Sequence, residues 1–361
     1  GQEAYAGGRR SADDMTDDRR SRRALLRSSV AAGTLLLAGC SGNESTGTPT
    51  PSGLLGGTDS GTTTGEGGQT DDDGPTGDSE RPSVVVGQRV LRESMGLLVE
   101  GTTRYGELPG PGTAPDGREY LVVVLSVKNR GDEAIEMGDL NAFRLTDGDG
   151  TTRERVDLVT QTGSQFTEGL LVPGETIRGF VAFEVAGDST GWTFVVDIES
   201  LETDLERVSV DLGADPRQPD ALFRQSLRVP VNEVGDSVTA ADLTVTVPEV
   251  RTADTVGRSR AGEGQEFLLP TVRVDNGKDR TAYLGLTGQM LLTGPRGTPQ
   301  ALDLGVQQQL DGAVPLNPNV EPGEHVEGEV PYLVDTGASP LYFSFDFTTS
   351  GADEKGIWQL R

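Results

Sequence analysis

An internal repeat constrains the fold of this 361-residue chain more than any other feature of its sequence. The apolar, alternating run at residues 120–129 returns at residues 267–276, and each run ends in asparagine. The same spacing of 147 residues carries Gly150 onto Gly297. Strands and turns that recur in one order at a fixed spacing indicate two copies of one domain.

Later in each copy the spacing becomes 149 residues, which carries the Pro-Gly-Glu turn at residues 173–175 onto residues 322–324. Short β-branched runs separated by Gly, Pro and Asp turns dominate both copies, without a convincing 3.6-residue period. The sequence therefore predicts an all-β fold of two tandem immunoglobulin-like antiparallel β-sandwiches after a disordered N-terminal region.

Alternation also predicts which side chains point into each core, because successive residues of a strand face opposite sides of the sheet. In the first copy the inward positions are Leu97, Val99, Leu121, Val123, Leu125, Val127, Trp192, Phe194, Val196 and Ile198. In the second copy they are Val245, Val247, Val272, Val274, Phe343 and Phe345.

The first forty residues resemble an export signal. Arg22 and Arg23 precede an uncharged stretch at residues 28–39, too short for a bilayer core that needs about 20 helical residues. The paired arginines resemble a twin-arginine signal. The sequence Leu-Ala-Gly-Cys that ends at Cys40 resembles a lipobox, so we expect a lipid on Cys40 to anchor the protein in the cell membrane, facing the exterior. Met15 would begin a signal of ordinary length.

Residues 41–82 are predicted to be a disordered tether. Gly, Ser, Thr and Pro make up 28 of the 40 residues from 41 to 80, and such a segment buries too little apolar surface to offset its ordering entropy. Asn43 begins an Asn-Glu-Ser sequon and is a candidate glycosylation site, although an unmodified tripeptide explains the pattern equally well. The expected organisation is a signal with lipobox at residues 1–40, the tether at 41–82, and sandwiches at 83–213 and 220–361.

The charge of the chain excludes nucleic-acid binding by the usual electrostatic route. With 31 Lys and Arg against 57 Asp and Glu, the net charge is −26, opposite in sign to a surface that neutralises phosphates. Only Lys128, Lys278 and Lys355 are lysines. A Lys-poor, acidic chain is typical of proteins that stay soluble when high salt screens their repulsion, so we interpret it as a halophile's protein.

A single Cys and a single His exclude multi-thiolate and His-pair metal sites. The Gly-x-Ser-x-Gly pattern at residues 187–191 precedes a strand pattern, which favours a hairpin turn over a nucleophile elbow. The Asp-Gly-Asp-Gly sequence at residues 147–150 lacks the spacing of acidic residues in a calcium loop, which favours a tight turn over a weak cation site. His325 is expected on an exposed polar face with Glu327 and Glu329. We therefore expect no catalytic residue, metal or cofactor.

Two long loops interrupt the strand pattern, at residues 103–119 and 251–266. Loops of more than about 12–15 residues are uncommon and are often functional or disordered. Disorder is the favoured interpretation of both loops. The alternative is that arginines of the second loop, among them Arg258 and Arg260, meet an acidic partner.

The chain resembles a family of extracytoplasmic immunoglobulin-like domains of unknown function in lipoproteins of Gram-positive bacteria and haloarchaea. The carriers of this resemblance are the two strands that end in Asn, the Leu-Thr-Asp-Gly-Asp-Gly turn at residues 145–150 and the two Pro-Gly-Glu turns. The resemblance implies a fold related to a small secreted mycobacterial antigen. It implies no shared catalytic residues, so no site is carried over from the family.

Location and architecture together predict a non-enzymatic surface protein that binds an extracellular protein or glycan through its two sandwiches. The alternative is a ligand-capture lipoprotein that serves a transporter, which would need a deep pocket lined by converging polar groups. A surface hydrolase is disfavoured, because the only histidine lies in the other copy from the Gly-x-Ser-x-Gly pattern.

Overall fold

The computed structural model describes residues 84–361, apart from residues 109–110, 138–141, 154, 157–165, 167–168, 199–202, 204, 206, 220 and 301. All described residues belong to one compact unit. The predicted export signal at Arg22 and Arg23, the lipid site Cys40, the sequon at Asn43 and the tether at 41–82 lie outside the described residues.

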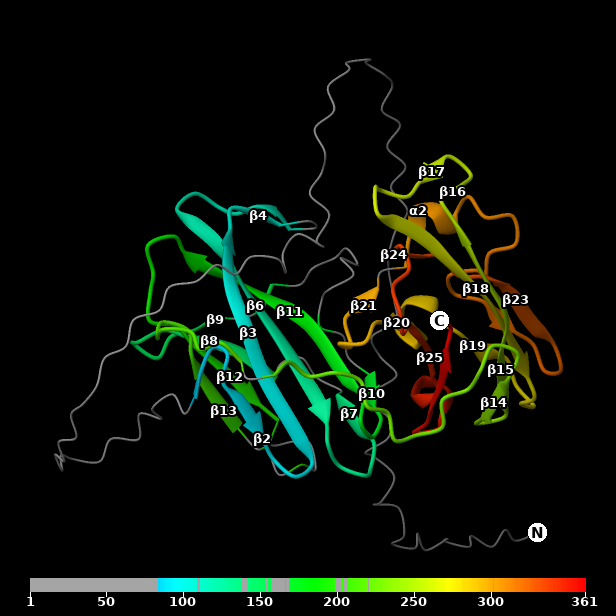
Figure 1. The fold of residues 1–361 in the computed structure, drawn as a ribbon, viewed down its shortest axis with the longest axis horizontal. Coiled ribbons are helices and arrows are strands. Elements are labelled where there is room, and N and C mark those ends of the chain that lie inside the picture. The colour runs from blue at the N-terminus through cyan, green and yellow to red at the C-terminus, as the bar shows by residue number, and fades with distance from the viewer. Residues whose placement is uncertain are drawn as a thin grey trace, which may run out of the picture. The chain divides into compact units, whose positions relative to one another are not determined.

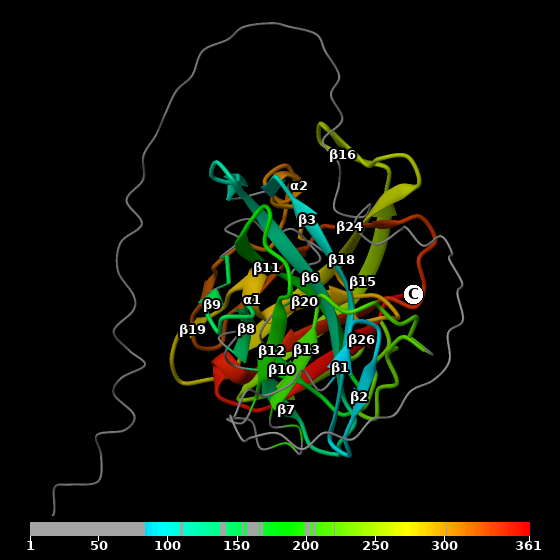
Figure 2. The same ribbon diagram turned by 90° about the vertical axis from the view of Figure 1, so that its left-hand side faces the viewer.

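The first copy is a sandwich of two main sheets (Figures 1 and 2). One sheet has the order β1-β13-β12-β8-β9 and the other β11-β6-β3-β2. Their bounds are β1 Val84–Val85, β2 Arg89–Leu91, β3 Met95–Tyr105, β6 Arg118–Asn129, β8 Phe143–Thr146, β9 Thr152–Arg153, β11 Thr176–Ala186, β12 Thr193–Asp197 and β13 Arg207–Asp211. Two smaller pairs are β4 Glu107–Leu108 with β5 Gly112–Thr113, and β7 Ile135–Met137 with β10 Gly169–Leu171.

The second copy repeats this topology, with sheets β14-β15-β18-β23 and β21-β20-β25-β26, and β24 also pairs with β18. Their bounds are β14 Ser237–Ala240, β15 Leu243–Ala253, β18 Gln265–Asn276, β20 Met290–Thr293, β21 Pro299–Gln300, β23 His325–Glu329, β24 Tyr332–Asp335, β25 Tyr342–Asp346 and β26 Lys355–Gln359. The smaller pairs are β16 Thr255–Val256 with β17 Ser259–Arg260, and β19 Ala282–Tyr283 with β22 Asn319–Val320.

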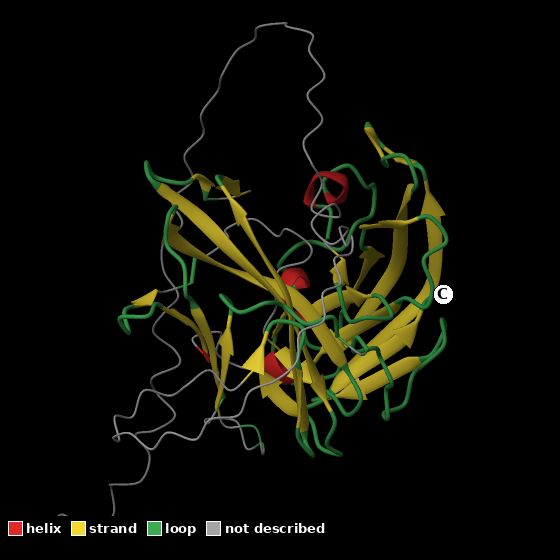
Figure 3. Cartoon of the chain, turned by 60° about the vertical axis from the view of Figure 1, so that its left-hand side comes forward, coloured by secondary structure: helices red, strands yellow, loops and turns green. Residues whose placement is uncertain are grey.

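Helices in the described residues are short turns: α1 Leu286–Gln289, α2 Leu304–Gln307 and a 3-10 turn at Thr348–Ser350 (Figure 3). Within this part of the chain, no helix has both the length and the apolar character to cross a membrane. Every described sheet takes its strands from one copy. The predicted all-β fold of two tandem immunoglobulin-like sandwiches is confirmed, while the exact boundaries 83–213 and 220–361 remain predictions.

Each copy has its own core, and the predicted inward positions are all buried. The ten predicted side chains of the first copy lie in one apolar cluster, where Phe143, Phe183 and Phe194 pack ring against ring. The six of the second copy lie in a separate cluster that includes Trp358. Period-2 alternation was sufficient to find these positions, because each sheet has one face against the core.

The repeat extends to individual hydrogen bonds. Asn129 ends β6 and Asn276 ends β18, and both side chains are buried. Asn129 Nδ2 donates to Leu171 O at 2.8 Å, and Asn276 Nδ2 donates to Val320 O, also at 2.8 Å. Each Oδ1 accepts from the backbone N–H two residues further on. In both copies, the asparagine that ends the strand thus links it by a hydrogen bond to the neighbouring β7–β10 or β19–β22 pair. This shared role explains why both copies have asparagine at this position.

The prediction that residues 103–119 and 251–266 are disordered loops is wrong for their described parts. β3 and β6 stay paired as far as Tyr105 and Tyr120, and β15 and β18 stay paired as far as Ala253 and Phe267. A small hairpin follows each extension, and its apolar residue, Leu108 or Val256, is buried. Glycines of both segments, among them Gly112 and Gly257, lie in these hairpins or in the turns beside them.

Residues 187–191 form a turn, but the predicted hairpin is wrong. β11 before the turn pairs with β6, whereas β12 after it pairs with β13 and β8, so the chain crosses between sheets. Ser189 Oγ donates to Ala186 O at 2.6 Å and accepts from Trp192 Nε1 at 3.1 Å. These bonds give Ser189 a structural role in the crossing.

Candidate functional site: the interface between the two copies

The segment between β13 and β14 lies along both copies. Gln225 Oε1 accepts a hydrogen bond from the backbone N–H of Thr176 in the first copy at 2.8 Å, and Gln225 Nε2 donates to Thr176 O at 2.9 Å. Further along, Asn232 N donates to Ile357 O of the second copy at 2.8 Å. The predicted sandwich boundaries leave residues 214–219 as the junction, and no sequence pattern indicated that the residues after them dock on both copies.

Phe223 in this segment is buried against β3. A Cβ at position 96 would lie 2.8 Å from Phe223 Cζ, so the ring rests where Gly96 has no side chain. The main chain of Arg224 accepts a hydrogen bond from Thr176 Oγ1 at 3.0 Å. The segment therefore covers part of the outer face of the β11-β6-β3-β2 sheet.

A charged cluster joins the copies beside this segment. Glu100 Oε2 accepts from Arg178 at 2.9 Å and from Arg296 of the second copy at 2.7 Å. The side chains of Glu100 and Arg178 are only 10% and 4% exposed. Burial alone would raise the pKa of Glu100, but the bonds and charges of Arg178, and then of Arg296, outweigh it and hold that pKa below its usual value.

Arg296 belongs to a turn that docks on the first copy. The N–H of Arg178 donates to Gly297 O at 3.0 Å, and a Cβ at position 297 would lie 1.8 Å from Thr176 O. The matching turn of the first copy ends at Gly150, where a Cβ would meet nothing within 4 Å. Gly150 and Gly297 both have a positive φ, so the two turns share this backbone conformation. Only the turn at Gly297 contacts the other copy.

A buried ion pair forms the second connection. Lys355 Nζ, at the start of β26, donates to both carboxylate oxygens of Glu175 at 3.1 Å. Glu175 Oε2 also accepts from Val172 N at 2.9 Å. Glu324, the matching residue of the second copy, is exposed.

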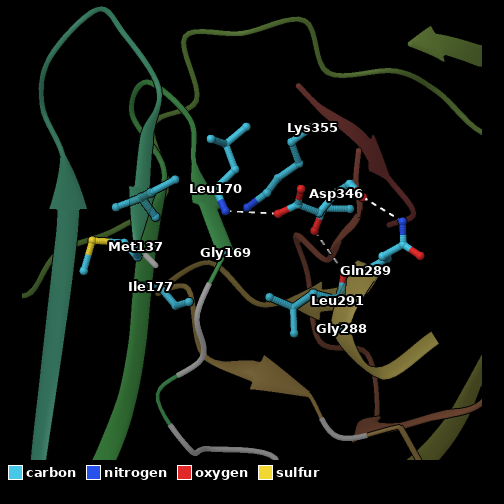
Figure 4. Close-up of a pocket in the computed structure, with 11 residues that line it drawn as sticks. Met137, Gly169, Leu170, Ile177, Gly288, Gln289, Leu291, Asp346 and Lys355 are labelled. Atoms are coloured by element: carbon cyan, nitrogen blue, oxygen red, sulfur yellow. Dashed lines mark hydrogen bonds between the residues drawn. The ribbon is translucent and has the colours of Figure 1, made fainter. Parts of the chain in front are cut away.

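A small pocket lies between these connections (Figure 4). Asp346 Oδ2 accepts from Leu170 N at 3.0 Å, and its Oδ1 accepts from Thr348 N at 2.9 Å. Gln289 Nε2 donates to Asp346 O at 3.2 Å. The free volume is about 30 Å³, which suits one or two water molecules. The polar groups that converge here bond to one another and leave no room for a solute.

The candidates weighed from the sequence lie elsewhere. Residues 147–150 form the predicted turn between β8 and β9, where Asp147 Oδ1 accepts from the backbone N–H groups of Asp149 and Thr151. His325 and Glu327 are exposed on β23, as predicted. No group of three or more potential metal ligands occurs among the described residues.

The arginines of the second predicted loop differ in their contacts. Arg251 forms an ion pair with two hydrogen bonds to Glu329, which lies on β23 as His325 and Glu327 do. Arg258 and Arg260 are exposed at the β16–β17 hairpin. The interface residues Glu100, Glu175 and Asp346 were missed at the sequence level, since nothing in the repeat marks which of two matching positions is buried.

The two sandwiches coincide with two matches to one family model, "Domain of unknown function (DUF4352)", at residues 87–203 and 232–355. No curated protein matches the chain.

Several solved structures are similar to this chain. The yjhA protein of Bacillus subtilis is 20% identical with a TM-score of 0.31, over 36% of this chain and 99% of that one. The lipoprotein candidate ycdA of Bacillus subtilis is 10% identical with a TM-score of 0.29, over 51% and 72% of the two chains. The secreted protein MPT63 of Mycobacterium tuberculosis is 15% identical with a TM-score of 0.28, over 38% and 100%.

Proposed function

Because the chain belongs to the DUF4352 family, with one copy of the domain in each sandwich, we propose that it is a non-enzymatic surface protein of a halophile, anchored by lipid on Cys40. Its two sandwiches bind an extracellular protein or glycan. Neither nucleic acid nor a cofactor takes part in this function.

The N-terminal pattern supports the location. Arg22 and Arg23 stand before a short apolar stretch, and the one cysteine of the chain falls at the last position of the lipobox. A Gly-, Ser- and Thr-rich tether of about 40 residues would have a root-mean-square span of about 35 Å as a flexible coil. Such a tether would hold the sandwiches clear of the lipid headgroups.

One observation carries the choice of binding over capture: among the described residues, the polar side chains between the copies pair with one another and leave only a small pocket. Ligand-capture proteins commonly bind their solute between domains, in pockets of about 300–1,000 Å³ with a few unpaired polar groups. Here Glu175 pairs with Lys355, Asp346 accepts from Leu170, and the pocket measures about 30 Å³. The geometry therefore favours recognition by exposed surfaces over enclosure of a small molecule.

Thermal shift in molar KCl tests this choice with the full chain carrying Cys40→Ser, which removes the lipid site. A captured solute at 100 times its Kd would stabilise the fold by about 2.7 kcal/mol. We expect no shift of that size from amino acids, monosaccharides or oligopeptides, and we expect the same protein to co-sediment with washed cell-envelope fragments. A saturable shift with one small solute, without envelope binding, would establish the capture alternative instead.

A further inference from the structure

The two copies differ at one pair of short strands. β7 and β10 of the first copy correspond to β19 and β22 of the second, at the repeat spacings of 147 and 149 residues. Glu136 faces Leu170 in the first pair, and Tyr283 faces Asn319 in the second. The registers agree, so the same surface of the sandwich can be compared position by position.

In the first copy this surface is the one that docks on the second copy. Leu170 and Val172 are buried in an apolar cluster with Ile357 of β26. Leu170 N also donates to Asp346 Oδ2 at 3.0 Å. The first copy thus uses an apolar version of the surface to hold its neighbour.

In the second copy the matching positions are polar and uncovered. Asn319 stands in the place of Leu170 and Glu321 in the place of Val172, and both are exposed. Tyr283 is 63% exposed, the largest exposed fraction among the large hydrophobic side chains of the described residues. The two positions that anchor the neighbouring sandwich in the first copy are therefore polar here, and the exposed aromatic side chain of Tyr283 lies on the same pair of strands.

Polar residues pair with Tyr283 or lie near it on the same strands. Directly paired residues of antiparallel strands have Cβ atoms about 5 Å apart, so the side chains of Asn319 and Tyr283 start side by side on one face. On the same ladder, Thr281 Oγ1 donates to Glu321 Oε2 at 2.9 Å. Asn317 Oδ1 lies 3.8 Å from the Cβ position of Gly285, two residues after the tyrosine. We call these five side chains, Thr281, Tyr283, Asn317, Asn319 and Glu321, the Tyr283 face.

We propose that the Tyr283 face binds a neutral glycan. A sugar ring has an apolar C–H face that can stack on an exposed aromatic ring, which combines large contact area with low conformational-entropy cost. Its hydroxyl groups both donate and accept, as do the amides of Asn317 and Asn319. The one formal charge on the face is the carboxylate of Glu321, which disfavours an anionic sugar. This inference rests on the proposed function and gives the partner its chemical class.

The test uses the full chain carrying Cys40→Ser, in molar KCl, with four neutral probes: maltoheptaose, cellohexaose, chitohexaose and yeast mannan. Titration calorimetry is expected to detect binding of at least one probe. Tyr283→Ala should weaken that binding at least tenfold and Asn319→Ala several-fold, whereas Tyr283→Phe keeps the ring and should stay within about threefold. Leu91→Ala removes another exposed apolar side chain, in the first copy, and is the matched control that should change nothing.

The proposal is overturned if none of the four probes binds, or if Tyr283→Ala binds them as tightly as the parent. It is also overturned if the parent is a dimer by light scattering and Tyr283→Ala makes it monomeric, because the face would then hold a second copy of the chain. None of these outcomes bears on the lipid anchor, which cell fractionation measures. None of them bears on envelope binding through a protein partner, which co-sedimentation measures. Failure of the glycan proposal is therefore distinguishable from failure of the proposed function.

Discussion

Lys355 and Glu175 are 180 residues apart in the sequence, yet Lys355 Nζ lies 3.1 Å from both carboxylate oxygens of Glu175. The two side chains are 7% and 5% exposed. Their pair joins the last strand of the second sandwich to the Pro-Gly-Glu turn of the first. A turn that both copies possess thus became a connection in one of them.

Removing the lysine should destabilise the protein strongly. Lys355→Met leaves the Glu175 carboxylate buried without its partner, a loss that typically costs about 3–5 kcal/mol. The measurement is urea unfolding in molar KCl. Arg144→Ala breaks the exposed Arg144–Asp197 pair and is the control, with an expected cost below about 1 kcal/mol. Equal, small losses in both variants would contradict a structural role for the buried pair.

Two matched glycine substitutions isolate the docked turn. Gly150→Ala and Gly297→Ala introduce the same strain at positive φ, but only the second places a Cβ against Thr176 O. We expect Gly297→Ala to be the more destabilising by at least about 1 kcal/mol, since overpacking typically costs about 1–3 kcal/mol. Hydrogen exchange at the Arg178 N–H, which donates to Gly297 O, should quicken in that variant alone. Identical exchange in the two variants would show that the turn does not dock in solution.

Acid should weaken the charged cluster at Glu100. Arg178 and Arg296 lower the pKa of Glu100 in the folded protein, so the ionised group adds stability above its ordinary pKa. That contribution is lost as the pH falls through the lowered, folded-state pKa. The free energy of unfolding, measured from pH 7 down to pH 3, should therefore fall less steeply in Glu100→Gln than in the parent. Parallel curves for the parent and Glu100→Gln would contradict a contribution of ionised Glu100 to stability.

Salt should stabilise the whole chain, because its net charge of −26 makes the compact state repel itself. Molar salt shortens the screening length to about 3 Å. The thermal midpoint is expected to rise steeply between low salt and molar KCl. A flat profile would contradict the interpretation of the protein as halophilic.

The sequence predicted the fold well because alternation and repeat spacing are local signals. Leu125 and Val272, or Phe194 and Phe343, face inward in both copies for the same reason, and the shared spacing identified each pair. The strand that ends in Asn was also visible, since Asn129 and Asn276 make the same bonds in both copies.

The interface could not be predicted, since it depends on differences between matching residues. Glu175 and Glu324 occupy the same turn, but only Glu175 meets a lysine, and that lysine is 180 residues away. Gly297 and Gly150 look alike in the sequence until the docked partner of Gly297 is known. The extended hairpins were missed because the glycines and charged residues of both segments resemble the composition of a disordered loop.

The fate of Cys40→Ser in the native host tests the central claim most directly. The measurement is the distribution of the protein among cytoplasm, membrane and medium, together with its digestion by protease added to intact cells. The account predicts that the parent fractionates with the membrane and is digested from outside, and that Cys40→Ser appears in the medium. Unchanged, detergent-dependent association of Cys40→Ser with the membrane, or protection of the parent from external protease, would contradict a lipid-anchored protein of the cell surface.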